Sequence, residues 1–259
     1  MSLHTYGQDG DGLPVVLLHG FPLDHRMWDA VAAAIPAGRR VLAVDLPGTP
    51  GRADDLPEPA LEASADDVAS ALREAGIERA VIAGLSMGGY VALALLERHP
   101  DLVAGLGLVD TKSTADTPEA HANRLRIADE VEATGSVDPI RPMASSLLGE
   151  TTKAARPEVA DEVAAWIEQQ EPAGVSWSQR AMAARPDRSD VLAAFGGPVV
   201  VVVGDEDTVT PVEAAEHMVA VARGARLVVV QHAGHLSAIE QPAAVAAALA
   251  DLVRAADSE

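Results

Sequence analysis

Short runs of valine, leucine and isoleucine recur along the chain, and each ends at a turn signal. They are Val15–Leu18, Val41–Val44, Val81–Ala83, Leu106–Val109, Val199–Val203 and Leu227–Val230. Helical patterns follow these runs, and such alternation is typical of α/β proteins. Because the runs are apolar at nearly every position, we expect both faces of each strand to be buried. The pattern predicts a mostly parallel central sheet flanked by helices.

The strand signal disappears between Thr111 and about Ala194. Some eighty residues are too many for a bare loop in a compact domain. Helical patterns cover Pro118–Thr134, Pro139–Leu148, Pro157–Gln170 and roughly Gly174–Ala184, several of which begin at proline, as the first turn of a helix permits. We predict a core of residues 1–111 and 195–259, with residues 112–194 inserted as a helical cap above the sheet edge.

Composition narrows the classes of partner. The 259 residues are 48% hydrophobic and carry a formal net charge of -20, which argues against nucleic acid because such binders need a basic patch. Without cysteine, disulfides, thiolate catalysis and cysteine-ligated metals are excluded. No secretory signal is visible, and the apolar runs are too short to cross a membrane. We therefore expect a soluble cytoplasmic protein.

The segment AVIAGLSMGGY, residues 80–90, carries the main chemical signal. An apolar run leads through Gly84-Leu85-Ser86-Met87-Gly88 into a helix-forming run, which is the order of a nucleophile elbow. In that turn, glycines leave room for the backbone while the serine hydroxyl rises above the sheet. A G-x-S-x-G is expected by chance in roughly one chain of this composition in twelve, so the context carries the prediction.

A serine hydroxyl is a poor nucleophile at neutral pH and needs a base that an acid orients. Three acids follow the run Val199–Val203, in the loop that reads Gly204-Asp205-Glu206-Asp207, and Asp110 follows an earlier run. Histidines 232 and 235 lie in the loop after Leu227–Val230. Gly234 gives His235 the backbone freedom to aim its imidazole. Acid and base candidates thus follow strands downstream of Ser86.

Five segments together resemble the α/β-hydrolases: LLHGFPLDHRMW, VDLPG, GLSMGG, the loop from Gly204 to Asp207, and Gly234-His235. The chain is most similar to small capped bacterial serine hydrolases, such as 3-oxoadipate enol-lactonases and pimeloyl-carrier-protein methyl ester esterases. It is more loosely similar to cofactor-free haloperoxidases and perhydrolases. Two segments depart from the family pattern: the loop 45–52 has an extra residue and no terminal serine, and the stretch before residue 15 is too short for a full opening hairpin.

The resemblance implies a role for each candidate residue. Ser86, Asp207 and His235 would form a Ser-His-Asp triad, and the backbone N–H groups of Phe21 and Met87 would bind the oxyanion. The competing residues would have structural roles: Asp205 in a turn, Asp110 at a strand end bonded to nearby backbone, and His19 and His232 in loops. Trp28, Trp166, Trp177, Met143 and Phe195 are candidates for the substrate pocket, although such side chains more often pack the core.

These implications predict a cofactor-independent serine hydrolase that cleaves a small carboxylic ester or lactone through an acyl-enzyme. Serine at the elbow, where haloalkane dehalogenases and epoxide hydrolases of this fold carry a carboxylate, argues against those two reactions. The sequence shows no H-E-x-x-H cluster and no glycine-rich phosphate loop, so we expect no metal and no cofactor. Two alternatives remain: a perhydrolase or haloperoxidase of the same fold, and a ligand receptor that retains the triad.

Overall fold

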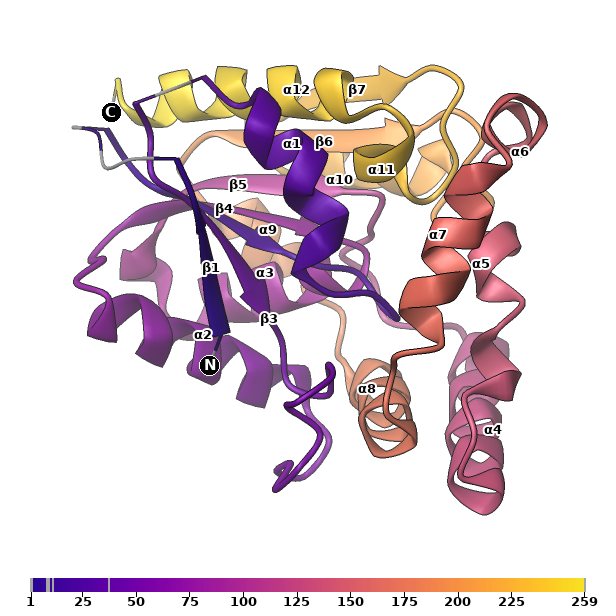
Figure 1. Cartoon of the computed structure of the whole chain (residues 1–259). Helices are drawn as coiled ribbons and strands as arrows, with labels where there is room; N and C mark the ends of the chain where they lie inside the picture. Colours follow the sequence, from indigo (N-terminus) through magenta and orange to yellow (C-terminus); the bar gives the residue numbers. More distant parts are fainter. Residues whose placement is uncertain (1, 8–9, 11, 37, 259) are drawn as a thin grey trace.

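A seven-stranded sheet forms the centre of the molecule (Figure 1). The computed structural model describes all residues except 1, 8, 9, 11, 37 and 259. The strand order is β1-β3-β2-β4-β5-β6-β7; β1 pairs antiparallel with β3, and the other pairs are parallel. The strands are β1 Ser2–Tyr6, β2 Val15–Leu18, β3 Val41–Asp45, β4 Ala80–Leu85, β5 Val103–Val109, β6 Val199–Gly204 and β7 Arg226–Val230. The predicted α/β fold class is confirmed.

All six predicted strands lie within observed strands, and β1 is the one that the pattern missed. Its sequence, SLHTY, has no continuous apolar run, and its residues are half-buried or exposed. A strand at the sheet edge has one uncovered side and needs no such run. Pairing sets Leu3 opposite Val44 of β3, so this single antiparallel strand forms one edge of the sheet beside β3.

Helices cover both faces of the sheet (Figure 1). One layer holds α1 Asp29–Ala34, α11 Ser237–Glu240 and α12 Pro242–Ala256, and α12 packs across β4 to β7. The other layer holds α2 Leu61–Glu74, α3 Met87–Arg98, α9 Ser189–Ala194 and α10 Val212–Val221. Two short 3-10 helices, η1 His25–Trp28 and η2 Pro100–Leu102, connect these elements. Both faces of the central strands are thereby removed from water.

The chain between β5 and β6 is helical and includes no strand among its described residues. Its elements are α4 Pro118–Thr134, η3 Asp138–Ile140, α5 Met143–Ser146, α6 Glu150–Ala155, α7 Glu158–Ile167, α8 Pro172–Ala184 and α9. The helix α4 has its predicted bounds because Thr117 caps its N-terminus and Gly135, with φ of 61°, ends it. In contrast, the predicted helix 139–148 is divided into η3 and α5.

The helices α4 to α8 lie together beside the sheet, with α4 packed against α8 and α5 against α7 (Figure 1). The helix α9 instead packs against α3 and α10. The division into a core of residues 1–111 and 195–259 and a cap of residues 112–194 remains a proposal.

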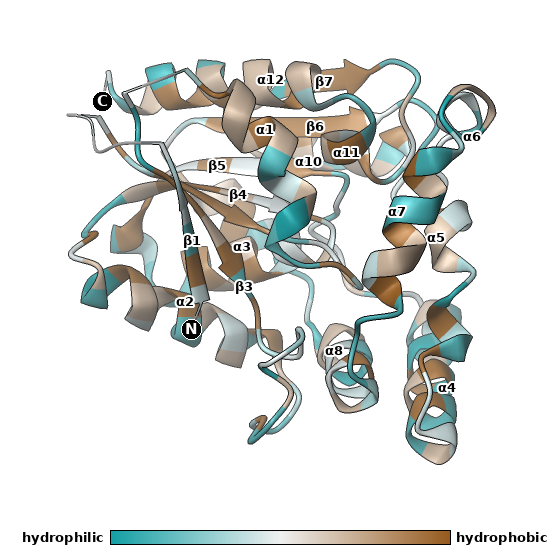
Figure 2. Cartoon of the chain, viewed as in Figure 1, coloured by the Kyte–Doolittle hydropathy of each residue, from teal (hydrophilic) through white to brown (hydrophobic). Residues whose placement is uncertain are grey.

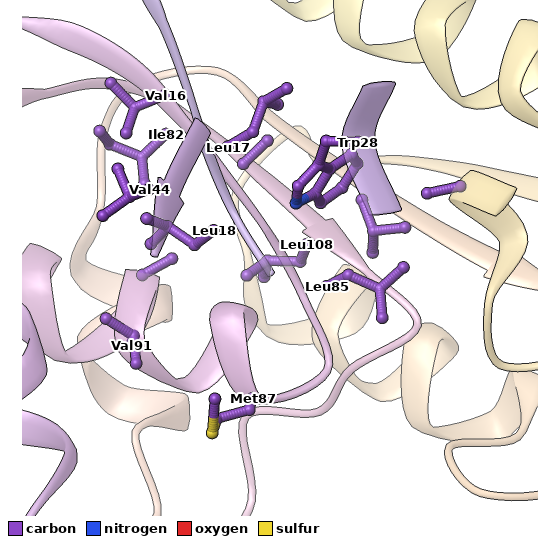
Figure 3. Packing of buried hydrophobic residues seen from close by; sticks show 14 of the residues in the cluster. Val16, Leu17, Leu18, Trp28, Val44, Ile82, Leu85, Met87, Val91 and Leu108 are labelled. Carbon is purple, nitrogen blue, oxygen red and sulfur yellow. The ribbon is translucent and has the colours of Figure 1, made fainter. Parts of the chain in front are cut away.

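The hydrophobic core follows the strands, and Figure 2 shows this apolar centre under more polar outer helix faces. Trp28, Leu17 and Leu85 are fully buried there (Figure 3). Burial of such a side chain contributes about 1.5–3 kcal/mol relative to exposure. Within the described residues, no helix is long and apolar enough to cross a membrane. This core fixes the strand ends, from which the loops of the candidate site extend.

Candidate active site

Ser86 occupies a tight turn between β4 and α3, with φ of 52° and ψ of -111°. Positive φ is uncommon for a residue other than glycine and costs roughly 1–3 kcal/mol. The turn also requires glycines on both sides, because a Cβ on Gly84 would lie 2.1 Å from the oxygen of Gly88, and one on Gly88 would lie 2.1 Å from the oxygen of Leu18. The steric reason for G-x-S-x-G is therefore present in the structure.

Neighbouring segments hold this turn in place. The Ser86 N–H donates to the Val109 carbonyl at 3.0 Å, and the Thr111 hydroxyl donates to the Ser86 carbonyl at 2.8 Å. Both partners belong to β5 and the loop after it. Two long-range bonds thus stabilise a backbone conformation that is costly in isolation.

Ser86, His235 and Asp207 form a continuous hydrogen-bonded chain. His235 Nε2 lies 2.9 Å from Ser86 Oγ, and His235 Nδ1 lies 2.8 Å from Asp207 Oδ2. All three residues are buried, with exposed fractions of 8%, 2% and 5% for Ser86, His235 and Asp207. Since Nδ1 faces a carboxylate, it carries the proton in the neutral ring, and Nε2 is the acceptor for the serine proton. The predicted nucleophile, base and orienting acid are thus within hydrogen-bonding reach of one another.

Asp207 is held by the loop that follows β6. Its Oδ1 accepts the N–H groups of Val209 and Thr210 at 2.8 and 3.0 Å, and its Oδ2 accepts the Thr210 hydroxyl at 2.8 Å. These bonds leave Oδ2 directed at His235. Burial alone would raise the pKa of Asp207, but the His235 hydrogen bond and charge lower it below 3.8. The carboxyl is ionised at neutral pH.

The contact between Asp207 and His235 shifts the pKa of the imidazole in the opposite direction. Burial alone would lower the pKa of His235, but the hydrogen bond and charge of Asp207 raise it above 6.5. An imidazole of higher basicity takes a proton from a hydroxyl more readily. The ion pair that forms after proton transfer is therefore stabilised by Asp207.

Phe21 and Met87 line one narrow pocket beside the turn that holds Ser86. Leu23, Thr49 and Val175 also line it, so it lies between the loops after β2 and β3 and the helix α8. Neither the Phe21 nor the Met87 N–H has an acceptor among the residues that the structure describes. A helix begins at Met87, so its free N–H also lies at the positive end of α3. The geometry suits an anion at this position.

A family model described as the alpha/beta hydrolase fold matches residues 14–242. The chain belongs to the α/β-hydrolase fold family. It is 32% identical over 254 residues to pimeloyl-acyl-carrier-protein methyl ester esterase of Aromatoleum aromaticum, covering 93% of this chain and 98% of that protein. A thermophilic esterase from Thermogutta terrifontis superposes with a TM-score of 0.90 at 36% identity, covering 99% and 93% of the two chains.

The enol-lactonase of Burkholderia xenovorans LB400 shares the fold, with a TM-score of 0.84 at 23% identity and coverage of 97% and 96% of the two chains. The resemblance read from the motifs is confirmed. The prediction that the chain is a hydrolase is confirmed by this α/β-hydrolase family match and by relatives that are named esterases.

In this α/β-hydrolase, the other candidates for the acid, Asp110 and Asp205, have different contacts. Asp110 accepts the N–H groups of Gly204 and Ser237 at 2.9 and 3.0 Å, and also the Ser237 hydroxyl. Burial and the charge of Asp207 raise the pKa of Asp110 to about 8. Asp205 accepts the Ala233 N–H at 3.4 Å. Neither carboxyl group is hydrogen-bonded to His235, which agrees with the structural roles expected of them.

His19 organises the loops around the pocket. Its Nε2 accepts the Leu46 N–H at 3.0 Å, and its Nδ1 lies 3.2 Å from the Gly20 oxygen. Complete burial lowers the pKa of His19, so the ring is neutral. This contact joins the loop after β2 to the atypical loop 45–52, which lines the pocket through Pro47, Gly48 and Thr49.

None of the five large apolar pocket candidates lines the narrow pocket within the described chain. Trp28 is fully buried in the core, and Trp177 donates to the Pro57 carbonyl at 2.7 Å. The Arg26 guanidinium lies over the Trp166 ring at 5.4 Å. The prevailing expectation that such side chains pack the structure holds for these three tryptophans.

Sequence reasoning missed Glu240, whose buried carboxylate accepts three backbone N–H groups. Two of them, from Gly234 and Leu236, flank His235 in the chain, and the third belongs to Gly149 between α5 and α6. Backbone donors leave no mark in the sequence. The only available signal was one acidic residue in the short segment between His235 and Pro242.

Proposed function

We propose that this protein is a cofactor-independent serine hydrolase that cleaves small carboxylic esters or lactones through an acyl-enzyme. The observation that carries the proposal is the unbroken chain from Ser86 Oγ through His235 to Asp207, at 2.9 and 2.8 Å. The free N–H groups of Phe21 and Met87 support it, because both residues line one pocket beside Ser86. The acyl-transfer reaction needs both parts.

The first half-reaction forms the acyl-enzyme. His235 Nε2 takes the Ser86 proton as Oγ bonds to the ester carbonyl carbon, and the N–H groups of Phe21 and Met87 bind the oxyanion of the tetrahedral intermediate. Asp207 stabilises the resulting imidazolium. The carbon–oxygen bond to the alcohol then breaks, and His235 donates its proton to the leaving alkoxide.

The second half-reaction repeats these steps with water. His235 accepts a proton from water as its oxygen attacks the acyl carbon, and collapse of the intermediate releases the carboxylic acid. Ser86 Oγ recovers the proton from His235, so one ester and one water give one acid and one alcohol. A lactone follows the same path, with acid and alcohol remaining in one product molecule.

Two comparisons support an ester substrate. The Aromatoleum relative is named a methyl ester esterase, and the Thermogutta structure is named an esterase. The narrowness of the pocket between Phe21, Met87 and Val175 favours a short acyl group. We infer that acetyl and butyryl esters are better substrates than octanoyl esters.

Hydrolysis of p-nitrophenyl acetate, butyrate and octanoate, with a lactone as a fourth substrate, tests the proposal. Ser86→Ala is expected to lose multiple turnover and labelling by a fluorophosphonate probe, whereas the exposed control Ser146→Ala keeps both. Full esterase activity in Ser86→Ala would overturn the assignment. Single-turnover ligand trapping by the wild type would identify a receptor, and activity that requires peroxide would identify a perhydrolase.

A further inference from the structure

The side chain of Thr210 contacts two residues of the proposed triad at once. Its hydroxyl donates to Asp207 Oδ2 at 2.8 Å, and the same hydroxyl oxygen lies 3.3 Å from His235 Nδ1. Asp207 Oδ2 and His235 Nδ1 are themselves 2.8 Å apart. Three polar atoms therefore form a closed triangle at the imidazole nitrogen that does not face Ser86.

The positions of the protons in this triangle follow from the chemistry of the three groups. An ionised carboxylate only accepts hydrogen bonds, so the Thr210 hydroxyl donates its single proton to Asp207 Oδ2. The hydroxyl oxygen keeps its lone pairs, which are the second and more distant acceptor for the Nδ1–H of His235. Both acceptors favour the tautomer in which Nε2 is free to take the Ser86 proton.

The hydroxyl is not needed for the turn that follows Asp207. That turn is made by Asp207 Oδ1, which accepts the N–H groups of Val209 and Thr210 at 2.8 and 3.0 Å. Threonine hydroxyls in turns commonly bond to nearby backbone, whereas this one bonds to the carboxylate oxygen that orients the histidine. Thr210 is only 2% exposed and does not line the narrow pocket within the described chain. Neither turn formation nor substrate contact therefore accounts for the hydroxyl.

We propose that Thr210 is a positioning residue of the ester hydrolysis, whose hydroxyl fixes Asp207 Oδ2 and the ring of His235 in the orientation that proton transfer needs. This inference rests on the proposed function, because it names a residue that orients the base of that reaction. Without the hydroxyl, Asp207 keeps both bonds to its Oδ1, but Oδ2 has only His235 as a partner among the described residues. The direction of the carboxylate is then less well fixed, and the ring loses one of its two contacts at Nδ1.

Loss of the hydroxyl should change the pKa of His235. A hydrogen bond to a carboxylate stabilises its charged form, so without this bond the charge on Asp207 Oδ2 acts more strongly on the imidazolium and raises the pKa. The contact from the hydroxyl oxygen to Nδ1 has the opposite effect, but at 3.3 Å it is weaker than the bond of 2.8 Å to Oδ2. Other charges act on the ring from Asp110 after β5 and Arg124 of α4, and Glu240 of α11 bonds the backbone on either side of the ring. Removal of the hydroxyl alters none of these groups.

Thr210→Val tests the proposal because it keeps the shape of the side chain and removes the hydroxyl, whereas Thr210→Ser keeps the hydroxyl. In hydrolysis of p-nitrophenyl acetate, Thr210→Val should lower kcat roughly tenfold and leave KM unchanged, since a small misplacement of a catalytic group affects the chemical step. The pKa of His235, measured by NMR titration and assigned with His235→Ala, should rise by about 0.5–1 in Thr210→Val. Thr210→Ser should keep both quantities near their wild-type values.

Thr152→Val is the matched control, because Thr152 of α6 is 1% exposed and its hydroxyl has no hydrogen-bond partner among the residues that the structure describes. It should keep the kcat, the KM and the His235 pKa of the wild type. Circular dichroism checks the fold of each variant. If valine at residue 210 disturbs the fold, Thr210→Ala removes the same hydroxyl with a smaller side chain and takes its place in both measurements.

The proposal is overturned if the pKa of His235 in Thr210→Val stays at or below the wild-type value, or if Thr210→Ser loses as much kcat as Thr210→Val. A lower kcat without a higher pKa would mean that the threonine only supports the fold. The NMR titration needs no turnover, so it separates this inference from the proposed function. A wild type without esterase activity would refute that function, whereas a raised pKa in Thr210→Val would still support the positioning of His235 by Thr210.

Discussion

Replacement of Glu240 should separate the positioning of His235, the proposed catalytic base, from the chemistry of that histidine. One oxygen of this carboxylate accepts the N–H groups of Gly234 and Leu236 at 2.9 and 3.2 Å, and the other accepts the Gly149 N–H at 2.9 Å. Glu240 is only 1% exposed. The side chain does not contact the reacting atoms, so Glu240 is a positioning residue for the loop that contains His235.

The magnitude follows from the three bonds. A hydrogen bond to a charged group contributes about 1.5–3 kcal/mol, and each buried donor left without a partner costs about 1–3 kcal/mol. Glu240→Ala leaves three buried donors without partners, and we expect a loss of about 3–9 kcal/mol. Glu240→Gln can keep its oxygen on the two N–H groups that flank His235, while its NH₂ group opposes the Gly149 N–H. Its loss should be about 1.5–3 kcal/mol.

Thermal melting and steady-state kinetics measure the two effects. At about 2–4 °C per kcal/mol for a chain of this size, Glu240→Ala should lower Tm by more than about 6 °C. Its kcat should fall by roughly 10- to 100-fold, since a misplacement of about 1 Å at a catalytic group has that effect. Glu240→Gln should lose less than tenfold. The exposed Glu213→Gln controls for loss of an acidic charge, and equal behaviour of Glu240→Ala and this control would refute the reasoning.

Three further outcomes are expected. Asp207→Asn should lower kcat by about 10⁴-fold. Asp110→Asn should lower it far less, because Asp110 is not hydrogen-bonded to His235. Equal losses in steady-state assays would contradict this. Since Asp207 raises the pKa of His235 above 6.5, kcat/KM should fall toward acid with a midpoint above that value, and a pH profile with a lower midpoint would oppose it. Gly88→Ala should lower Tm by at least about 6 °C, because its Cβ would lie 2.1 Å from a carbonyl oxygen, whereas Gly196→Ala, with open space around it, should melt as the wild type does.

The pKa shifts of His235 and Asp207 make the stability of the fold depend on pH in opposite directions. His235 has a raised pKa in the folded state, so its stabilising contribution is present below about pH 6.5 and is lost as pH rises through the folded pKa. Asp207 has a lowered pKa, so its contribution is present above about pH 4 and is lost as pH falls through the folded value. The pair contributes most in the acid range between these limits, where the histidine is protonated and catalysis is suppressed.

The fold was predictable to the extent that burial leaves a pattern in the sequence. Parallel strands buried on both faces appear as continuous valine and leucine runs, which is why β2 and β6 could be read directly. The edge strand β1 is half-exposed and left no such run. The helix α4 kept its predicted bounds because Thr117 and Gly135 cap it locally, whereas the division of 139–148 depends on packing between elements.

The residues of the candidate site also divide into those that the sequence marks and those that it does not. Ser86 and His235 are marked by glycines that their turns require, so the residue types themselves carry the signal. The acid was different: Asp205 and Asp207 lie two residues apart in one loop, and only the turn made by Asp207 with Thr210 directs its carboxylate at the imidazole. Glu240 was invisible because its partners are backbone N–H groups, which every sequence contains.

Residues 147–151, from the end of α5 into the first turn of α6, link the helical insertion to the loops of the proposed triad. Leu147 accepts the His235 N–H at 2.9 Å, Gly149 donates to Glu240, and Thr151 donates through its N–H to Glu206 at 2.8 Å. The last of these reaches the loop of Asp207, so both loops of the proposed triad are bonded to one short stretch of the insertion. Since these bonds are made by backbone groups at the insertion, a shift of that stretch moves the base and its orienting acid together. In the proposed reaction, substrate contacts on the insertion can therefore change kcat as well as KM, because Gln170, Gly174 and Val175 of the same insertion line the pocket.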